Sequence, residues 1–292
     1  MEKNKVAVIG AGLMGNGIAQ ACATAGYDVV NIDTFEAAIE KSKATVEKLF
    51  SRKVAKGSMT EEKKAEIRRR LTYSQNFEDV KGAFLVVEAV PEKIEIKKDT
   101  FKKVDELADA ETIIVSNTSG LSISEIASVT NRPDKVMGAH FFYPAPVMKL
   151  LELVRGLVTS DETYDVVKEF AGKIGKTTVD APEFPGFMVN RILVPMQNEA
   201  AFMVMEGSKP EDVDNAMKLG CNHPMGPIEL TDFVGIDTML ATMTGLYNGF
   251  HDSKYRPCPL LETMVKSGML GKKTGQGFYK YDEKGNKIGS NF

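Results

Sequence analysis

Short apolar runs recur along the first half of the chain, and amphipathic, charge-rich segments separate them. Runs of this kind, bounded by turn residues, predict buried strands, and the segments between them have the length and periodicity of helices. The expected strands span residues 5–9, 28–32, 84–88, 113–116, 136–140 and 150–154. The expected helices span residues 13–25, 36–56, 60–70, 93–108, 122–127 and 159–174. Strands that alternate with helices predict βαβ units and a mainly parallel sheet.

The pattern changes near residue 185. Beyond Pro185 and Gly186, strand-like runs nearly vanish and apolar residues recur at helical spacing. The expected helices of this half span residues 187–207, 210–219, 227–247 and 260–267. We therefore expect an α/β chain in which a mainly parallel sheet domain, residues 1–185, is followed by a smaller all-α domain, residues 186–292.

Composition narrows the class of protein. The 292 residues, 43% hydrophobic and 26% charged, suit an ordinary globular protein of two domains. A net charge of -3 gives no reason to expect nucleic acid or an anionic membrane as partner. The sequence lacks both a signal-peptide core and an apolar run near the ~20 residues that span a bilayer. Its three cysteines and three histidines are scattered, without metal-binding spacing. We expect a cytoplasmic, metal-free protein.

The turn between the first expected strand and helix carries a glycine-rich motif. This G-x-G-x-x-G is formed by Gly10, Ala11, Gly12, Leu13, Met14 and Gly15. Gly10 permits a tight turn, Gly12 lets the backbone approach a pyrophosphate, and Gly15 lets the helix pack on the strand. Free N–H groups at the helix start favour the phosphates. Asp33, at the end of the second strand, can bind ribose hydroxyls and would repel a 2′-phosphate. Together they predict a Rossmann-type domain with NAD as cofactor.

If NAD accepts a hydride from an alcohol, another group must take the alcohol proton. Near neutral pH, histidine is the usual residue for this role. His140 ends an expected strand, and open parallel sheets bind ligands beyond the carboxyl ends of their strands. Glu152 lies inside an apolar strand, where a carboxylate is costly unless paired, so His140 is its candidate partner. Ser119 follows another strand, and Asn190 opens the helical half. The alternative interpretations are that His140 is a core histidine and that Glu152 is a surface acid on an edge strand.

Several blocks of the sequence, in order along nearly the whole chain, resemble the 3-hydroxyacyl-CoA dehydrogenase family, most closely its bacterial 3-hydroxybutyryl-CoA branch. The blocks are GAGLMGNGIA at 10–19, VVEAVPE at 86–92, SNTS at 116–119, HFFYPAPVMKLLELV at 140–154, PGFMVNR at 185–191, AMKLG and PMGPIEL within 216–230, and GKKTGQGFYKY at 271–281. The resemblance implies hydride transfer between NAD and C3 of a short 3-hydroxyacyl-CoA, and a homodimer.

The resemblance also implies a role for individual residues. His140 is similar to the family's general base, Glu152 to the acid that orients it, and Ser119 and Asn190 to residues that bind the reacting oxygen. The expected cofactor contacts besides the glycine motif and Asp33 are Glu92, Lys97, Asn117, Ser119, Tyr143 and Lys273. The expected coenzyme A contacts are Ser51, Lys53 and Lys56, with Ser119 and Asn190 at the acyl end. Tyr143 departs from the family's usual asparagine, which places its contribution in doubt.

Other functions remain open at this point. A dehydrogenase of a free 3-hydroxy acid also pairs such domains, but it typically relies on a lysine in the helical half. A nucleotide-binding protein without catalysis could keep the fold, since fold does not fix function. The chain begins at its first strand, so a stand-alone enzyme is expected rather than one module of a larger one.

Overall fold

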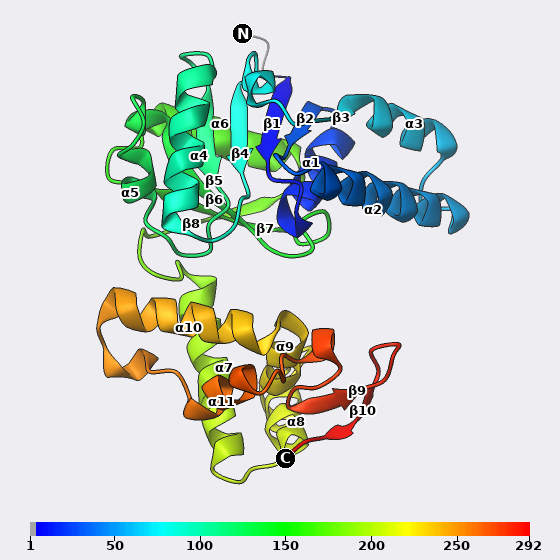
Figure 1. Cartoon of the computed structure of the whole chain (residues 1–292), viewed down its shortest axis with the longest axis vertical. Helices are drawn as coiled ribbons and strands as arrows, with labels where there is room; N and C mark the ends of the chain where they lie inside the picture. Colours follow the sequence, from blue (N-terminus) through cyan, green and yellow to red (C-terminus); the bar gives the residue numbers. More distant parts are fainter. Residues whose placement is uncertain (1–3) are drawn as a thin grey trace. The chain divides into compact units, whose positions relative to one another are not determined.

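The computed structural model describes residues 4–292 (Figure 1). The chain separates into two compact units, the first ending at Glu183 and the second beginning at Phe184. The first unit is α/β and the second is mainly helical. The expected fold class, a mainly parallel sheet domain followed by a helical domain, is therefore confirmed.

An eight-stranded sheet forms the centre of the first unit, in the order β3-β2-β1-β4-β5-β6-β7-β8. The strands are β1 Lys5–Ile9, β2 Asp28–Ile32, β3 Leu71–Ser74, β4 Leu85–Glu88, β5 Ile113–Ser116, β6 Val136–Phe141, β7 Leu150–Arg155 and β8 Thr177–Ala181. The first six run parallel, whereas β7 pairs antiparallel with β6 and parallel with β8. The order changes direction between β1 and β4, and α/β sheets bind ligands at such a switch point.

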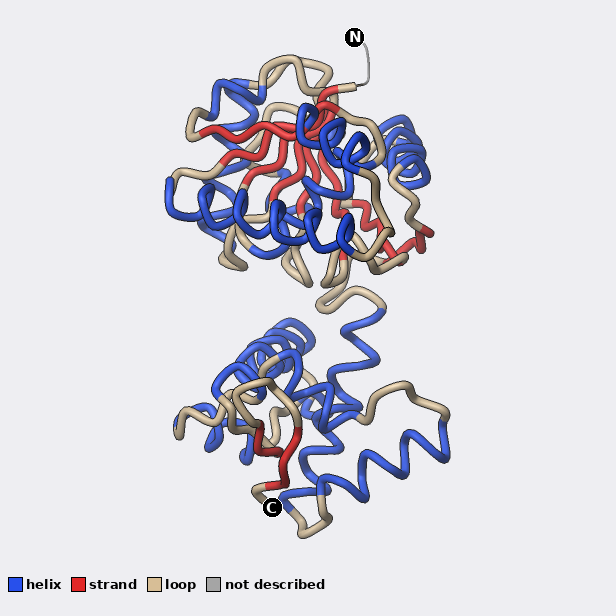
Figure 2. The backbone as a smooth tube through the Cα atoms, turned by 90° about the vertical axis from the view of Figure 1, so that its right-hand side faces the viewer, coloured by secondary structure: helices blue, strands red, loops and turns tan. Residues whose placement is uncertain are grey.

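Helices cover both faces of this sheet (Figure 2). They are α1 Leu13–Thr24, α2 Glu36–Ala55, α3 Glu61–Arg70, α4 Ile94–Leu107, α5 Ile123–Ala127 and α6 Asp161–Lys173, with short turns η1 Phe77–Val80 and η2 Pro133–Lys135. Val6 and Val8 of β1 share a core with Ile18 of α1 and Phe170 of α6. The intervening Ala7 is equally buried, on the opposite face. Burial at successive positions explains why the strands read as continuous apolar runs.

Two strands of the sheet, β3 and β8, were not expected from the sequence. They occupy its two edges and are short and polar, LTYS and TTVDA. An edge strand needs only one neighbour and leaves part of its surface in water, so it lacks the apolar run that marks a central strand.

Five helices and a hairpin form the second unit as the structure describes it. They are α7 Val189–Met205, α8 Pro210–Cys221, α9 Pro227–Val234, α10 Ile236–Phe250 and α11 Pro259–Lys266, with turns η3 Ser253–Tyr255 and η4 Lys272–Thr274 and strands β9 Tyr279–Tyr281 and β10 Lys287–Ser290. The helix expected over 227–247 is broken at Gly235, whose φ of 107° no helix accommodates. The hairpin corrects the expectation that this unit is entirely helical. No helix within residues 4–292 is long and apolar enough to cross a bilayer.

Two buried carboxylates hold the hairpin against the helices. Asp232 of α9 accepts hydrogen bonds from the backbone N–H groups of Phe278 and Tyr279, both at 2.9 Å. Asp214 of α8 accepts one from the Tyr279 hydroxyl at 2.6 Å. Burial raises the pKa of both carboxyls. A Cβ on Gly277 would lie 2.1 Å from an Asp232 oxygen, so this approach requires glycine.

Candidate active site

The loop between β1 and α1 contains three glycines whose surroundings differ. Gly10 has φ 101°, and a Cβ on it would lie 2.6 Å from the carbonyl oxygen of Ala89. A Cβ on Gly15 would lie 2.0 Å from the carbonyl oxygen of Gly10. A Cβ on Gly12 would meet no protein atom within 4 Å. Gly10 and Gly15 are therefore required by packing, whereas Gly12 leaves open space in front of the backbone.

The chain's own side chains leave the start of α1 uncapped. Gly12 is the N-cap and supplies no side-chain hydrogen bond. At the end of β2, Asp33 accepts a hydrogen bond from the Ala11 N–H at 2.7 Å and another from the Phe35 N–H at 2.9 Å. These bonds fix the carboxylate beside the glycine loop. Uncapped N–H groups favour phosphate, and a fixed carboxylate favours ribose hydroxyls.

A cavity of about 700 Å³ opens at this loop. Gly10, Gly12, Leu13, Met14 and Asp33 line it, whereas Ala11 and Gly15 do not. Its remaining walls include Phe35, Phe77 and Lys103, which the sequence did not single out. The open space at Gly12, the uncapped helix start and the size of the cavity fit a dinucleotide such as NAD. A signal for Phe35 was present in the sequence, because this aromatic residue lies two positions after Asp33.

A network of polar groups lies at the carboxyl ends of β4 and β5. The Glu92 carboxylate accepts hydrogen bonds from the backbone N–H of Ser119 at 2.7 Å and from the Thr118 hydroxyl at 2.5 Å. Lys97 is buried and its ammonium contacts Glu92 at 3.2 Å and Glu88 at 2.7 Å. The structure thus brings the predicted residues Glu92, Lys97 and Ser119 together. It adds Glu88, which the sequence presents only as the last residue of an apolar strand.

Asn117 joins the ends of two neighbouring strands. Its side-chain oxygen accepts a hydrogen bond from the Phe141 N–H at 2.9 Å, and its own N–H donates to the Glu88 carbonyl at 2.8 Å. The residue thereby fixes the end of β6 against that of β5.

His140 and Glu152 face each other across β6 and β7. They are directly opposed in the antiparallel register, and the His140 Nδ1 lies 2.6 Å from a Glu152 oxygen. Glu152 is fully buried on an interior strand, so it is no surface acid. His140 is 5% exposed, and the Phe142 ring packs against its imidazole at a centroid distance of 4.5 Å. A buried carboxylate at this distance fixes the orientation of the ring.

The segment after β6 is clamped in place. The Lys176 ammonium donates hydrogen bonds to the carbonyl oxygens of Ala145 and Met148, at 2.5 and 2.6 Å. Burial lowers the pKa of Lys176. A Cβ on Gly17 of α1 would approach Ala145 to 3.2 Å, so helix and loop are in close contact. On this fixed loop the Tyr143 side chain is half exposed, which leaves it accessible to a ligand.

The predicted coenzyme A residues lie at the end of α2. Ser51 contacts Glu47 at 3.2 Å and the Lys64 ammonium at 2.9 Å. Glu47 also pairs with Lys64. Neither Lys53 nor Lys56 forms an ion pair within the residues that the structure describes. Their charges are therefore available to a ligand.

Two predicted residues belong to the second unit. Asn190 is the second residue of α7. Lys273 lies in η4, and its ammonium pairs with Asp237 at 2.5 Å, directly over Gly235. The other two histidines lie at helix ends. His251 is the exposed C-cap of α10, and His223 follows α8.

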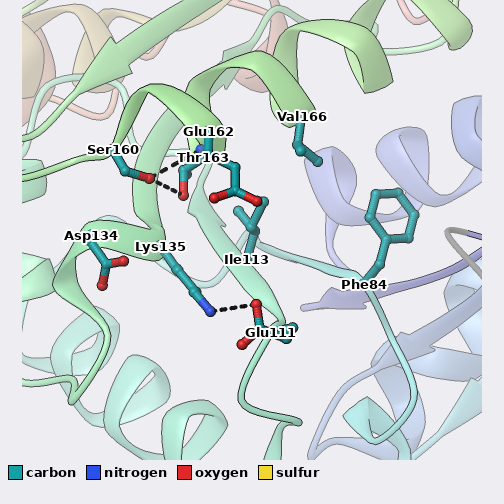
Figure 3. A pocket seen from close by; sticks show the side chains of 9 residues that line it. All are labelled: Phe84, Glu111, Ile113, Asp134, Lys135, Ser160, Glu162, Thr163 and Val166. Atoms are coloured by element: carbon teal, nitrogen blue, oxygen red, sulfur yellow. Dashed lines mark hydrogen bonds and ion pairs between the residues drawn. The ribbon is translucent and has the colours of Figure 1, made fainter. Parts of the chain in front are cut away.

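A second, smaller pocket of about 200 Å³ lies at the amino ends of β5 and β6 (Figure 3). Figure 3 shows Lys135 paired with Glu111, at 2.8 Å, beside the Ser160 cap of α6. None of the predicted site residues lines this pocket. Across residues 4–292, no group of three histidine, cysteine or acidic side chains is placed to hold a metal ion.

Comparison with known proteins gives consistent relatives. The family model for the NAD-binding domain of 3-hydroxyacyl-CoA dehydrogenase matches residues 5–184, and that for its C-terminal domain matches residues 186–281. A probable 3-hydroxybutyryl-CoA dehydrogenase of Bacillus subtilis is 50% identical over 97% of this chain and 99% of its own. A 3-hydroxybutyryl-CoA dehydrogenase of Clostridioides difficile is 49% identical, over 96% and 100%.

A solved structure agrees with these sequence relatives. The crystal structure of an (S)-3-hydroxybutyryl-CoA dehydrogenase from Ralstonia eutropha superimposes with a TM-score of 0.93 at 47% identity. The match covers 97% of this chain and 100% of that one.

Proposed function

The chain belongs to the 3-hydroxyacyl-CoA dehydrogenase family and is an NAD-dependent enzyme, and we propose that it interconverts (S)-3-hydroxybutyryl-CoA and acetoacetyl-CoA. The observation that supports this reaction most is the buried pair of His140 and Glu152, at 2.6 Å, in the same sheet as the dinucleotide cavity. Bound NAD supplies the nicotinamide that exchanges a hydride with C3 of the substrate.

His140 is the proposed proton carrier. An ionised carboxylate can only accept hydrogen bonds, so the His140 Nδ1 carries the hydrogen that faces Glu152, and Nε2 is the basic nitrogen. In oxidation Nε2 takes the proton of the C3 hydroxyl group, and in reduction it returns that proton to the developing alkoxide. Glu152 stabilises the imidazolium formed on the way and keeps the ring in one orientation.

Ser119 and Asn190 are the proposed partners of the reacting groups. The Ser119 hydroxyl donates to the C3 oxygen, where negative charge develops during reduction. Its backbone is held by the Glu92 carboxylate, which limits the positions that the hydroxyl can reach. Asn190, at the start of α7, is the proposed contact of the helical unit with the acyl group of the substrate.

The remaining proposed contacts divide between the cofactor and coenzyme A. The glycine loop, residues 10–15, and Asp33 bind the adenosine and pyrophosphate of NAD, while Glu92, Asn117, Tyr143 and Lys273 are the further proposed cofactor contacts. Ser51, Lys53 and Lys56 contact the phosphates of coenzyme A, since cations without an ion-pair partner attract them.

Each domain has its own proposed task. Residues 1–185 bind NAD and carry the proton-transfer pair, and residues 186–292 bind substrate and form a homodimer. The enzyme acts in the cytoplasm.

A substrate and cofactor comparison tests this function. Purified enzyme should oxidise NADH with acetoacetyl-CoA and leave free acetoacetate unreduced. Only the thioester substrate has the coenzyme A moiety that the enzyme is proposed to bind. NADPH should be much poorer, since Asp33 repels its 2′-phosphate. Equal turnover of acetoacetate and acetoacetyl-CoA would point to a free-acid dehydrogenase instead. Turnover of neither would contradict the proposal.

A further inference from the structure

The segment that joins β6 to β7 is held by a lysine from outside it. The Lys176 ammonium donates hydrogen bonds to the carbonyl oxygens of Ala145 at 2.5 Å and Met148 at 2.6 Å. Among residues 4–292 it pairs with no carboxylate, and burial lowers the pKa of this ammonium. A partly buried cation loses hydration, and here only neutral carbonyl groups replace the lost water. Lys176 is therefore committed to the backbone of this segment.

The same segment is fixed at two further points. At its start, the Asn117 side-chain oxygen accepts a hydrogen bond from the Phe141 N–H at 2.9 Å. Farther along, a turn closes on the Pro144 carbonyl oxygen, which accepts from two backbone N–H groups at 2.9 and 3.0 Å. Only Phe142 and Tyr143 lie between these points. The position of Phe142 thus depends on how firmly the turn is held, and both carbonyl groups bound by the lysine belong to that turn.

Phe142 contacts the proposed proton carrier. Its ring packs against the His140 imidazole, with the centroids 4.5 Å apart and the ring planes at 48° to each other. The Glu152 carboxylate holds the same imidazole at Nδ1. One hydrogen bond fixes one atom of the ring, and the second side-chain torsion of histidine is a soft one. A side chain packed on the imidazole restricts that torsion, and with it the position of Nε2.

We propose that Phe142 and Lys176 are positioning residues for His140. Phe142 holds the imidazole from the side, and Lys176 holds the segment that carries Phe142. The inference rests on the proposed role of His140 in proton transfer. A misplacement of a reacting group by about 1 Å can cost about 10²-fold in rate, so loss of part of this support should be visible in kcat.

A double-mutant cycle tests the proposal. Lys176→Met removes the N–H donors and keeps most of the apolar side chain, and water can reach the carbonyl group of the exposed Met148. We expect kcat, measured at saturating NADH and acetoacetyl-CoA, to fall about tenfold. Lys176→Arg, which keeps N–H donors, should recover most of it. Added to Phe142→Leu, the change Lys176→Met should lower kcat no further, because the ring that it positions is gone.

A nuclear magnetic resonance signal of His140 reports the position of the imidazole directly. The chain has three histidines, and the signal that is missing from His140→Ala is that of His140. The ring current of Phe142, with its centroid 4.5 Å away, displaces this signal. Lys176→Met and Phe142→Leu should both move the signal towards that of a free imidazole.

The matched control is Lys173→Met, three positions earlier. It removes an exposed lysine that pairs with Glu169 at 2.7 Å. This variant should leave both kcat and the His140 signal unchanged.

The outcomes separate this inference from the function on which it rests. Parent kcat in Phe142→Leu or Lys176→Met, or additive losses in the cycle, overturns the positioning role and leaves the proposed function intact. Loss of kcat with an unmoved His140 signal does the same. If Lys176→Met does not fold, Phe142→Leu still decides by both readouts. Near-parent turnover by His140→Ala shows that the proposed proton carrier is wrong, and the inference fails with it.

Discussion

For each glycine of the β1–α1 loop, the atoms that an added methyl group would meet decide whether a substitution affects stability or ligand binding. Gly12→Ala places its methyl group in open space, where a bound pyrophosphate would lie. We expect the variant to fold with an unchanged Tm and to bind NADH about tenfold or more weakly. Calorimetry and fluorescence titration measure the two quantities.

Gly15→Ala is the matched comparison, because its methyl group would meet the Gly10 carbonyl at 2.0 Å. It should lose about 1–3 kcal/mol of stability through overpacking. Tight NADH binding by Gly12→Ala would show that the dinucleotide does not pass this residue.

The sequence predicts a site residue when its chemical type is unusual for the secondary structure around it. A glycine motif between a strand and a helix indicates a bound phosphate, and an acid inside an apolar strand indicates a buried partner. Glu88 and Ser116 gave no such signal, because an acid and a hydroxyl at the ends of apolar strands look like ordinary strand termini. Only the strand register shows that they meet, with the Ser116 hydroxyl donating a hydrogen bond to the Glu88 carboxylate at 2.6 Å.

At the scale of elements, the α2–α3 hairpin carries the charge that we assign to coenzyme A. Lys53→Gln with Lys56→Gln removes two cations that lack ion-pair partners within the described residues. We expect the KM for acetoacetyl-CoA to rise about tenfold, because phosphate groups lose charge-assisted contacts, while the KM for NADH changes little.

The matched control removes two positive charges from α3 instead. Lys63 and Arg68 already pair with Glu66 and Glu47, at 3.0 and 3.3 Å. Lys63→Gln with Arg68→Gln should have a small effect on either KM, since exposed pairs contribute little. Equal effects of the two double variants would contradict the placement at the end of α2.

Elements were predictable where burial leaves a clear mark on the sequence, as a continuous apolar run in a strand or a helical period in a helix. Central strands, buried on both faces, and the long charged helices have bounds close to those expected. The edge strands β3 and β8 and the β9–β10 hairpin were missed because their polar residues pair at the margin of a sheet. The break between α9 and α10 depends on Gly235, and a lone glycine within a helical pattern does not by itself reveal a positive φ.

At the scale of the whole molecule, the second unit leaves large apolar side chains exposed. They include Ile192 at 71%, Leu219 at 87% and Phe233 at 49% exposure. We expect the proposed homodimer to cover such side chains, since contiguous apolar surface marks interfaces between proteins. We expect sedimentation equilibrium to give twice the mass of the chain at micromolar concentration. A monomer at that concentration would contradict the proposed homodimer.

The most direct test of the account is the turnover of His140→Ala. Loss of the proton carrier should lower kcat by about 10²–10⁴-fold and leave the Kd for NADH near its parent value, because the imidazole acts on the substrate oxygen. His251→Asn, which changes an exposed imidazole in a left-handed position suited to asparagine, should keep full activity. A His140→Ala enzyme that reduces acetoacetyl-CoA at near the parent rate would remove the His140–Glu152 pair from the mechanism.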